Sequence, residues 1–265
     1  MNPRVLTELD GRGVFTITLA DEERRNALGR DLVAEFVAAM RRADEDPAVR
    51  VVVVTNTGRV FCAGADLAER SAPAVGDDAG DAEPDTDPAE LFARIRRSPK
   101  PYVGRIAGHA VAGGMGLAAA MDLSVAVRGA RFGFTEVRVG VAPAMISVIC
   151  LPKMRQADAA EAFLRANRFD ADEAVRLGLF NRAVDPDGLD AAVEAIVADL
   201  LAGGPEALAA TKSLLTRVPA LDFEEAMRWT AELSARLFAG AEAAEGMAAF
   251  LERRPPAWAP ANDAD

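Results

Sequence analysis

Ile106-Ala-Gly-His-Ala-Val-Ala-Gly-Gly-Met-Gly-Leu117 is the stretch that decides the fold, and Phe61-Cys-Ala-Gly-Ala-Asp-Leu67 is its counterpart earlier in the chain. Each is a glycine-rich turn between an apolar run typical of a β-strand and a pattern typical of a helix. Such turns leave backbone N–H groups unpaired at the start of a helix. Two N–H donors that converge from separate turns form an oxyanion hole, which stabilises negative charge on a carbonyl oxygen. The sequence therefore predicts a site that enolises a carbonyl compound.

Composition excludes several classes of protein. The chain has 265 residues, 51% of them hydrophobic, which is enough for one large domain with a sizeable core. Its formal net charge is −11, and it lacks the basic face that a nucleic-acid binder needs. Cys62 and Cys150 match no metal-ligand spacing or disulfide framework. No apolar run reaches the roughly 18 residues of a membrane span, and the N-terminus has no apolar signal core. We therefore expect a cytoplasmic protein that binds no metal, nucleic acid or membrane.

Short apolar runs alternate with helical patterns in the first half of the chain, which is typical of an α/β core with parallel strands. A glycine-containing turn at residues 10–13 separates Val5–Leu9 from Val14–Leu19 and predicts a hairpin. Further strands are predicted at Val51–Asn56, Tyr102–Ile106, Leu123–Val127 and Arg131–Phe134, and helices at Asp31–Arg42 and Ala112–Met121.

The last third of the chain carries helical patterns. Leu189, Val193, Ile196, Val197 and Leu200 keep helical spacing. Further helices are predicted at Pro205–Thr216, Phe223–Phe238 and Ala241–Leu251. We expect residues 1–200 to form the α/β core and residues 201–265 to form a helical region for packing or assembly.

An acidic stretch rich in Pro and Gly, Ser71–Pro88, separates the two glycine turns, and Val75 is its one large aliphatic residue. This composition predicts a mobile surface loop. Because the stretch follows the first glycine turn, a lid over the site is an alternative to a plain linker. Length and composition carry no chemistry, so they favour the linker.

A set of motifs in a fixed order resembles the crotonase (enoyl-CoA hydratase/isomerase) superfamily from about Val5 to Trp258. The motifs are Asn26-Ala-Leu28, Phe61–Leu67, Gly108-His-Ala-Val-Ala-Gly-Gly114, Asp122-Leu123, Arg131-Phe-Gly-Phe-Thr-Glu136, Phe169–Ala174, Gly178-Leu179 and Phe250-Leu-Glu-Arg-Arg254. The resemblance implies a spiral of ββα units followed by a C-terminal helical region that mediates trimerisation. It also implies homotrimers or dimers of trimers, acyl-CoA thioester substrates, and no cofactor beyond the CoA of the substrate itself.

Carried over by position, the oxyanion donors are the backbone N–H groups of Ala65 and Gly113. One of the superfamily's two catalytic carboxylates matches Glu136. The other matches Gly116, which cannot transfer a proton. Taken without the resemblance, Glu136 reads as an ion-pair partner of Arg138. With the resemblance, we expect it to be the catalytic acid–base, with a pKa raised by partial desolvation.

The resemblance also marks residues for binding the substrate and its CoA: Arg24, Ala27, Ala63, Asp66, Leu67, Gly114, Gly116 and Arg254. The charged residues among them have plainer alternatives. Asp66 fits a helix cap, and the arginines fit solvated surface charges. His109, the one histidine, is expected to pack or hydrogen-bond beside the second glycine turn, because a dyad with Cys62 has no third group to orient it.

Three functions remain open. The run Glu136-Val-Arg-Val-Gly-Val-Ala-Pro-Ala-Met-Ile-Ser147 resembles bacterial methylglutaconyl-CoA hydratase-like members and favours addition of water to a 2-enoyl-CoA. The single carboxylate suits Δ3-Δ2 enoyl-CoA isomerisation. A non-catalytic acyl-CoA-binding homologue is the third reading, and retention of Glu136 and both glycine turns counts against it.

Overall fold

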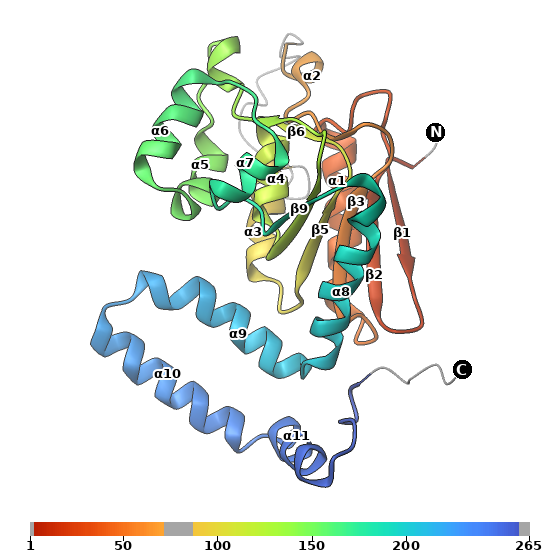
Figure 1. The fold of residues 1–265 in the computed structure, drawn as a ribbon, viewed down its shortest axis with the longest axis vertical. Coiled ribbons are helices and arrows are strands. Elements are labelled where there is room, and N and C mark those ends of the chain that lie inside the picture. The colour runs from red at the N-terminus through yellow and green to blue at the C-terminus, as the bar shows by residue number, and fades with distance from the viewer. Residues whose placement is uncertain (1–2, 72–86, 260–265) are drawn as a thin grey trace, which may run out of the picture.

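Figure 1 shows an α/β body from which the last helices of the chain extend. The computed structural model describes residues 3–71 and 87–259. The strands are β1 (Val5–Leu9), β2 (Val14–Leu19), β3 (Val51–Asn56), β4 (Val60–Cys62), β5 (Tyr102–Ile106), β6 (His109–Val111), β7 (Leu123–Val127), β8 (Phe132–Gly133) and β9 (Arg182–Val184). The helices are α1 (Arg30–Glu45), α2 (Leu67–Ser71), α3 (Pro88–Arg97), α4 (Gly113–Ala120), α5 (Ala144–Cys150), α6 (Gln156–Arg165), α7 (Ala171–Arg176), α8 (Leu189–Ala202), α9 (Pro205–Arg217), α10 (Phe223–Phe238) and α11 (Ala241–Glu252).

The strands form two sheets. The larger has the order β1-β2-β3-β5-β7-β9, with β1 antiparallel to β2 and every other pair parallel. The smaller has the order β4-β6-β8 and is parallel throughout. Three strands of the large sheet are each followed by a strand of the small sheet and then by an α-helix, in the units β3-β4-α2, β5-β6-α4 and β7-β8-α5. The fold is therefore built from repeated ββα units.

The large sheet is buried on both faces. All six residues of β3, Val-Val-Val-Val-Thr-Asn, are buried, as expected of a central parallel strand. Helix α1 covers one face, where Phe36 and Met40 are fully buried. Helix α8 covers the other face with Ile196 and Val197, and Figure 1 shows it running along the strands.

Periodic segments were predicted well, and short ones were missed. The predicted strands at residues 5–9, 14–19, 51–56, 102–106 and 123–127 are confirmed, as is helix Phe223–Phe238. Strands β4 and β6 lie inside the two glycine-rich stretches that the sequence assigned to turns. Of the predicted loop Ser71–Pro88, residues 72–86 lie outside the described part, while Ser71 ends α2 and Pro88 begins α3. Division of the chain near residue 200 stays a prediction. Among the described residues, no helix is both long and apolar enough to cross a bilayer.

An ion pair between a buried lysine and a partly exposed aspartate holds α9 against the body. Lys212 of α9 is 7% exposed, and its Nζ lies 2.7 Å from Oδ2 of Asp122, just before β7. The same ammonium group donates a hydrogen bond to the carbonyl of Lys100 at 2.9 Å and lies 5.1 Å from the ring centre of Tyr102. Asp122 Oδ2 also accepts from the Tyr102 amide at 2.8 Å. These contacts tie the C-terminal helices to the start of the central strands.

Replacing Lys212 with Ala is expected to cost about 1–3 kcal/mol of unfolding free energy, because the Asp122 carboxylate, whose side chain is 27% exposed, loses its charged partner and keeps only the hydrogen bond from the Tyr102 amide. Urea or thermal unfolding followed by circular dichroism measures this loss. Arg96→Ala is the matched control, since exposed Arg96 donates one hydrogen bond to the carbonyl of Thr216 at the same joint. A loss for Lys212→Ala no larger than that of the control would contradict the account.

Candidate active site

The carboxyl edge of the small sheet collects the three predicted catalytic groups. Ala65 lies three residues after β4 ends at Cys62, and Gly113 lies two residues after β6 ends at Val111. Glu136 lies three residues after β8 ends at Gly133. Because the three strands are parallel neighbours, their carboxyl ends lie at one edge, where α/β proteins place their ligands.

The two glycine-rich turns are in van der Waals contact. A methyl group on Gly64 would lie 3.0 Å from the amide nitrogen of Gly113, and one on Gly113 would lie 3.7 Å from the amide nitrogen of Ala65. Gly64 has φ +88°, a left-handed conformation that suits glycine. Ala112, with φ +51° and ψ −130°, is strained for a residue with a side chain and directly precedes Gly113. The backbone is thus held in an uncommon shape where the two amides approach each other.

Both amides are available to a ligand. Within residues 3–71 and 87–259, neither the N–H of Ala65 nor that of Gly113 has a hydrogen-bond acceptor. Gly113 is the first residue of α4, where N–H groups have no partner inside the helix and the helix dipole is positive. Two free amides in adjoining turns are the arrangement of donors that an oxyanion requires.

A loop ahead of α1 supports the first turn. The Leu28 amide donates to the Gly64 carbonyl at 2.7 Å, and the Ala63 amide donates to the Arg25 carbonyl at 3.1 Å. Asn26 is fully buried at φ +51°, and its Nδ2 donates to the Val60 carbonyl at 2.8 Å. The sequence analysis identified Asn26 as part of a motif but did not predict that its side chain joins this loop to β4.

Glu136 is half-buried and has no ion-pair partner among the described residues. Its Oε2 atom is shielded from solvent and makes no hydrogen bond within the described chain. Burial raises the pKa of this carboxyl group, and a hydrogen bond from its own backbone N–H offsets the effect in part. Arg138, the partner expected from the sequence, donates instead to the carbonyl of Ala166 at 2.9 Å and to that of Arg165 at 3.3 Å. The ion-pair reading of Glu136 is therefore wrong.

No second carboxylate fits where the sequence has Gly116. A methyl group on Gly116 would lie 2.1 Å from Cγ2 and 2.6 Å from Cβ of Ile146, on α5. Gly116 is buried, and Ile146 is 3% exposed. The Ile146 side chain thus occupies the space that a side chain at position 116 would enter.

Two of the three polar candidates for binding CoA, Arg24 and Asp66, lie beside the first turn. Arg24 NH1 lies 3.7 Å from Asp66 Oδ2 and 3.3 Å from Glu69 Oε1, so two carboxylates balance its charge. Asp66 Oδ1 accepts from the Ala68 amide at 2.9 Å, which confirms it as a cap of α2. Glu69 Oε2 accepts from the Arg30 amide at the start of α1. The sequence did not single out Glu69, whose two oxygens join α2 to this neighbourhood.

Of the remaining binding candidates, some lie close to Ala65 and one lies far from it. Ala63 and half-buried Ala27 belong to the loop and turn around Ala65, and Leu67 is 56% exposed at the start of α2. Gly114 packs on β4, since a methyl group there would lie 2.1 Å from the Cys62 carbonyl oxygen. Arg254 is not brought to this site.

Arg254 follows α11, which lies at the opposite end of the molecule from α2 in Figure 1. Its guanidinium group is held by Glu245 and Glu252, each at 2.6 Å. A role for Arg254 at the site of its own chain has no support in this arrangement.

His109 and Cys62 do not form a nucleophilic dyad. His109 Nδ1 accepts a hydrogen bond from the Arg131 amide at 2.8 Å, as expected for a packing and hydrogen-bonding role. Burial, together with the charges of Arg59, Arg168 and Arg131, lowers the pKa of His109. Burial raises the pKa of the Cys62 thiol to about 12, which keeps it protonated at neutral pH.

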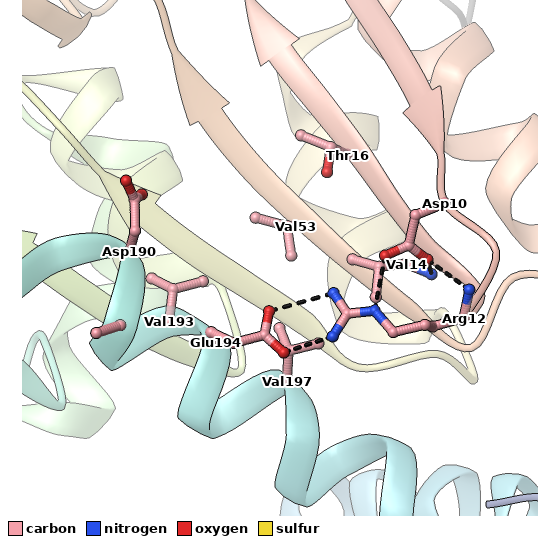
Figure 2. Close-up of a pocket in the computed structure, with 10 residues that line it drawn as sticks. Asp10, Arg12, Val14, Thr16, Val53, Asp190, Val193, Glu194 and Val197 are labelled. Carbon is pink, nitrogen blue, oxygen red and sulfur yellow. Dashed lines mark hydrogen bonds and ion pairs between the residues drawn. The ribbon is translucent and has the colours of Figure 1, made fainter. Parts of the chain in front are cut away.

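A surface hollow between β2 and α8 lies apart from this site (Figure 2). Arg12 extends across it toward Glu194 and is also bound by Asp10 at 3.0 Å. Its lining residues are Asp10, Arg12, Val14, Thr16, Val53, Asp190, Ala191, Val193, Glu194 and Val197. Three carboxylates against one arginine make it unsuited to the phosphates of CoA.

Comparison with known proteins decides the family. The model of the family described as enoyl-CoA hydratase/isomerase matches residues 10–261. The chain belongs to this family. The enoyl-CoA hydratase/isomerase fold is confirmed by a crystal structure of enoyl-CoA hydratase from Mycobacterium smegmatis, with a TM-score of 0.86 and 34% identity over 97% of this chain and 99% of that one.

Named relatives of this hydratase/isomerase family member differ in their acyl groups. Crotonyl-CoA hydratase from Syntrophomonas wolfei is 32% identical over 86% of this chain and 88% of the relative. Mevalonyl-coenzyme A hydratase SIDH from Beauveria bassiana is 31% identical over 92% of this chain and 91% of the relative. The chain is thus an enzyme of the hydratase/isomerase type.

Glu136→Gln is expected to stabilise the folded protein at neutral pH. The raised folded-state pKa means that the folded protein holds this proton more tightly than the unfolded chain, so stability is lost as pH rises through that pKa. Glutamine avoids the loss, and below about pH 4 the parent and the variant should converge. Thermal unfolding at both pH values measures the difference.

The matched control is Glu161→Gln, which changes an exposed glutamate of the nearby helix α6 that pairs with Arg165 on the surface. Surface ion pairs contribute little to stability, so this variant should unfold close to the parent at both pH values. A Glu136→Gln protein that is less stable than the parent at pH 7 would contradict desolvation of the carboxylate.

Proposed function

We propose that this enzyme adds water to the 2,3-double bond of a 2-enoyl-CoA thioester, in the cytoplasm and with no metal or further cofactor. The observation that carries the proposal is the placement of two free amides and one half-buried carboxylate with an unpartnered Oε2 atom at the carboxyl edge of the small sheet. The named hydratases among the relatives support the same reaction type.

The proposed mechanism uses one carboxylate for both proton transfers. The N–H groups of Ala65 and Gly113 donate to the thioester oxygen as it gains negative charge. Glu136 takes a proton from water, the hydroxide bonds to C3, and the electron pair of the double bond moves to form the enolate. Glu136 then returns the proton to C2, which restores the thioester carbonyl. A carboxyl pKa raised toward neutrality suits a group that must both accept and donate.

Isomerisation is the second candidate, and the Gly116–Ile146 contact favours it. Here Glu136 takes a proton from C2 of a 3-enoyl-CoA and returns it to C4, while the same amides hold the enolate. This reaction needs one proton-transfer group and no water. Assays of purified protein with crotonyl-CoA, a 3-enoyl-CoA and 3-methylglutaconyl-CoA, read by absorbance and mass spectrometry, distinguish the two.

Glu136→Gln is expected to lower kcat by roughly 10²–10⁴-fold, because glutamine keeps the shape of the side chain but cannot transfer a proton. Binding of acetoacetyl-CoA, measured by calorimetry, should stay close to that of the parent, since both amide donors remain. Glu161→Gln again serves as the control for kcat. Turnover of Glu136→Gln within about threefold of the parent would remove Glu136 from the mechanism.

We also propose that the enzyme assembles as a trimer or a dimer of trimers through α10 and α11. Leu233 is the one buried residue of α10. Phe223 and Phe238 of α10 are 74% and 70% exposed, and Phe250 of α11 is 82% exposed. Apolar surface of this kind in one chain marks a protein interface, and further copies of the same chain would cover it.

Light scattering of the purified protein should give three or six times the 27.9 kDa chain mass. Phe238→Glu places a charge in the proposed interface and should shift the mass toward the monomer. Leu6→Glu, at a 46% exposed leucine of β1, is the control and should keep the parental mass. A parent protein that stays at 27.9 kDa at all concentrations would overturn the assembly.

A further inference from the structure

Helix α5 has one buried face, and that face is made by two side chains. Of its seven residues, all described by the structure, Ile146 and Cys150 are buried. They lie four residues apart and therefore project from the same side of the helix. Met145 and Val148 are 47% and 65% exposed and project elsewhere.

The Ile146 end of this face lies against the helix that begins with an oxyanion donor. Gly116 is three residues after Gly113 on α4, so the two residues lie one turn apart on the same face of the helix. A methyl group at Gly116 would overlap both Cβ and Cγ2 of Ile146. The overlap involves Cβ and the methyl carbon Cγ2 bonded to it, so rotation about the Cβ–Cγ1 bond of Ile146 would not make room.

The segment that leads into α5 is bonded to Glu136. The Glu136 carbonyl accepts a hydrogen bond from the Val141 amide at 3.2 Å, three residues before α5 begins. The negative charge of Glu136 also contributes, after burial, to the raised pKa of the Cys150 thiol. Glu136 Oε2 is shielded from solvent with no hydrogen-bond partner among the described residues. Helix α5 therefore follows the proposed catalytic carboxylate closely in the chain and packs against the helix that carries the proposed oxyanion donor.

We propose that Ile146 is a specificity-determining residue, whose side chain fills the space beside Gly116 and forms an apolar wall of the acyl site near Glu136. The inference rests on the proposed function, since it takes the edge of the small sheet as the acyl-CoA site. The part of the substrate that meets this wall is an alkyl group on the reacting carbons, and Ile146 limits its size. One methyl group at an apolar wall of this kind changes discrimination by about 10–200-fold.

The test compares binding of two saturated thioesters that cannot be hydrated or isomerised, butyryl-CoA and 3-methylbutyryl-CoA. Calorimetry gives the ratio of the two Kd values for the parent, Ile146→Ala, Ile146→Val and the control Val148→Ala. We expect Ile146→Ala to shift the ratio toward the branched ligand by at least about tenfold. Ile146→Val should shift it in the same direction by less, and Val148→Ala should leave it unchanged.

Steady-state kinetics test the role of Ile146 in a second way. The ratio of kcat/KM for 3-methylcrotonyl-CoA to that for crotonyl-CoA should rise in Ile146→Ala, mainly through KM, because Glu136 and both amides are untouched. The paired variant Gly116→Ala with Ile146→Ala should unfold at a higher temperature than Gly116→Ala alone, since the truncation removes Cγ2, the atom that the new methyl group would meet at the shortest distance, and leaves only the contact with Cβ.

The outcomes separate the inference from the function on which it rests. If the parent binds both thioesters and the Kd ratio is the same in every variant, Ile146 is not a wall of the acyl site, and hydration or isomerisation still stands. If folded parent binds neither thioester at millimolar concentration, the proposed function fails and the inference fails with it. Should Ile146→Ala not fold, the ratio for Ile146→Val decides between these outcomes.

Discussion

The parallel hydrogen bonding of three very short strands is the constraint on which the rest of the site depends. The Ala110 amide donates to the Arg131 carbonyl, and the Ala112 amide donates to the Gly133 carbonyl. These bonds fix the register of β6 against β8. The pairing of β6 with β4 fixes the register on the opposite edge of β6. A one-residue shift would rotate the following turn and move the Gly113 amide away from the Ala65 amide. The strands are too short to hold that register alone, so the larger sheet and its helices must position them.

Close packing around α4 follows from the same constraint. The helix can approach β4 because Gly114 has no side chain to meet the Cys62 carbonyl. That approach sets the position of Gly113 at the start of the helix and keeps its amide near the first turn. A row of small residues leaves space on the other side of α4, and a neighbouring helix fills that space with Ile146. An edge with two free amides and one carboxylate is the chemical result of this packing.

The sequence predicted the parts of the fold that have a period and missed those that do not. The continuous apolar run of β3 and the helical spacing of α10 are long enough to identify an element from its own residues. A three-residue strand such as β6 has no measurable period, and it was assigned to the turn that follows it. At the site, glycine turns and motif order placed Ala65, Gly113 and Glu136. The contact between Gly116 and Ile146, thirty residues apart, has no local signature and required the tertiary structure.

Glu136 lacks the ion pair that would make its burial less costly for the stability of the folded protein. Arg138 is two residues away, and an ion pair between them would lower the cost of burying the carboxylate. The arginine instead satisfies carbonyl groups at the end of α6, where Ala166 stands at φ +49° and leaves helix carbonyls in need of donors. The carboxylate therefore keeps a free, desolvated oxygen in a chain whose net charge is already −11. Nearby residues of opposite charge usually pair, and this expectation fails here because the arginine satisfies helix carbonyls, which leaves a carboxylate oxygen free for the proposed proton transfer.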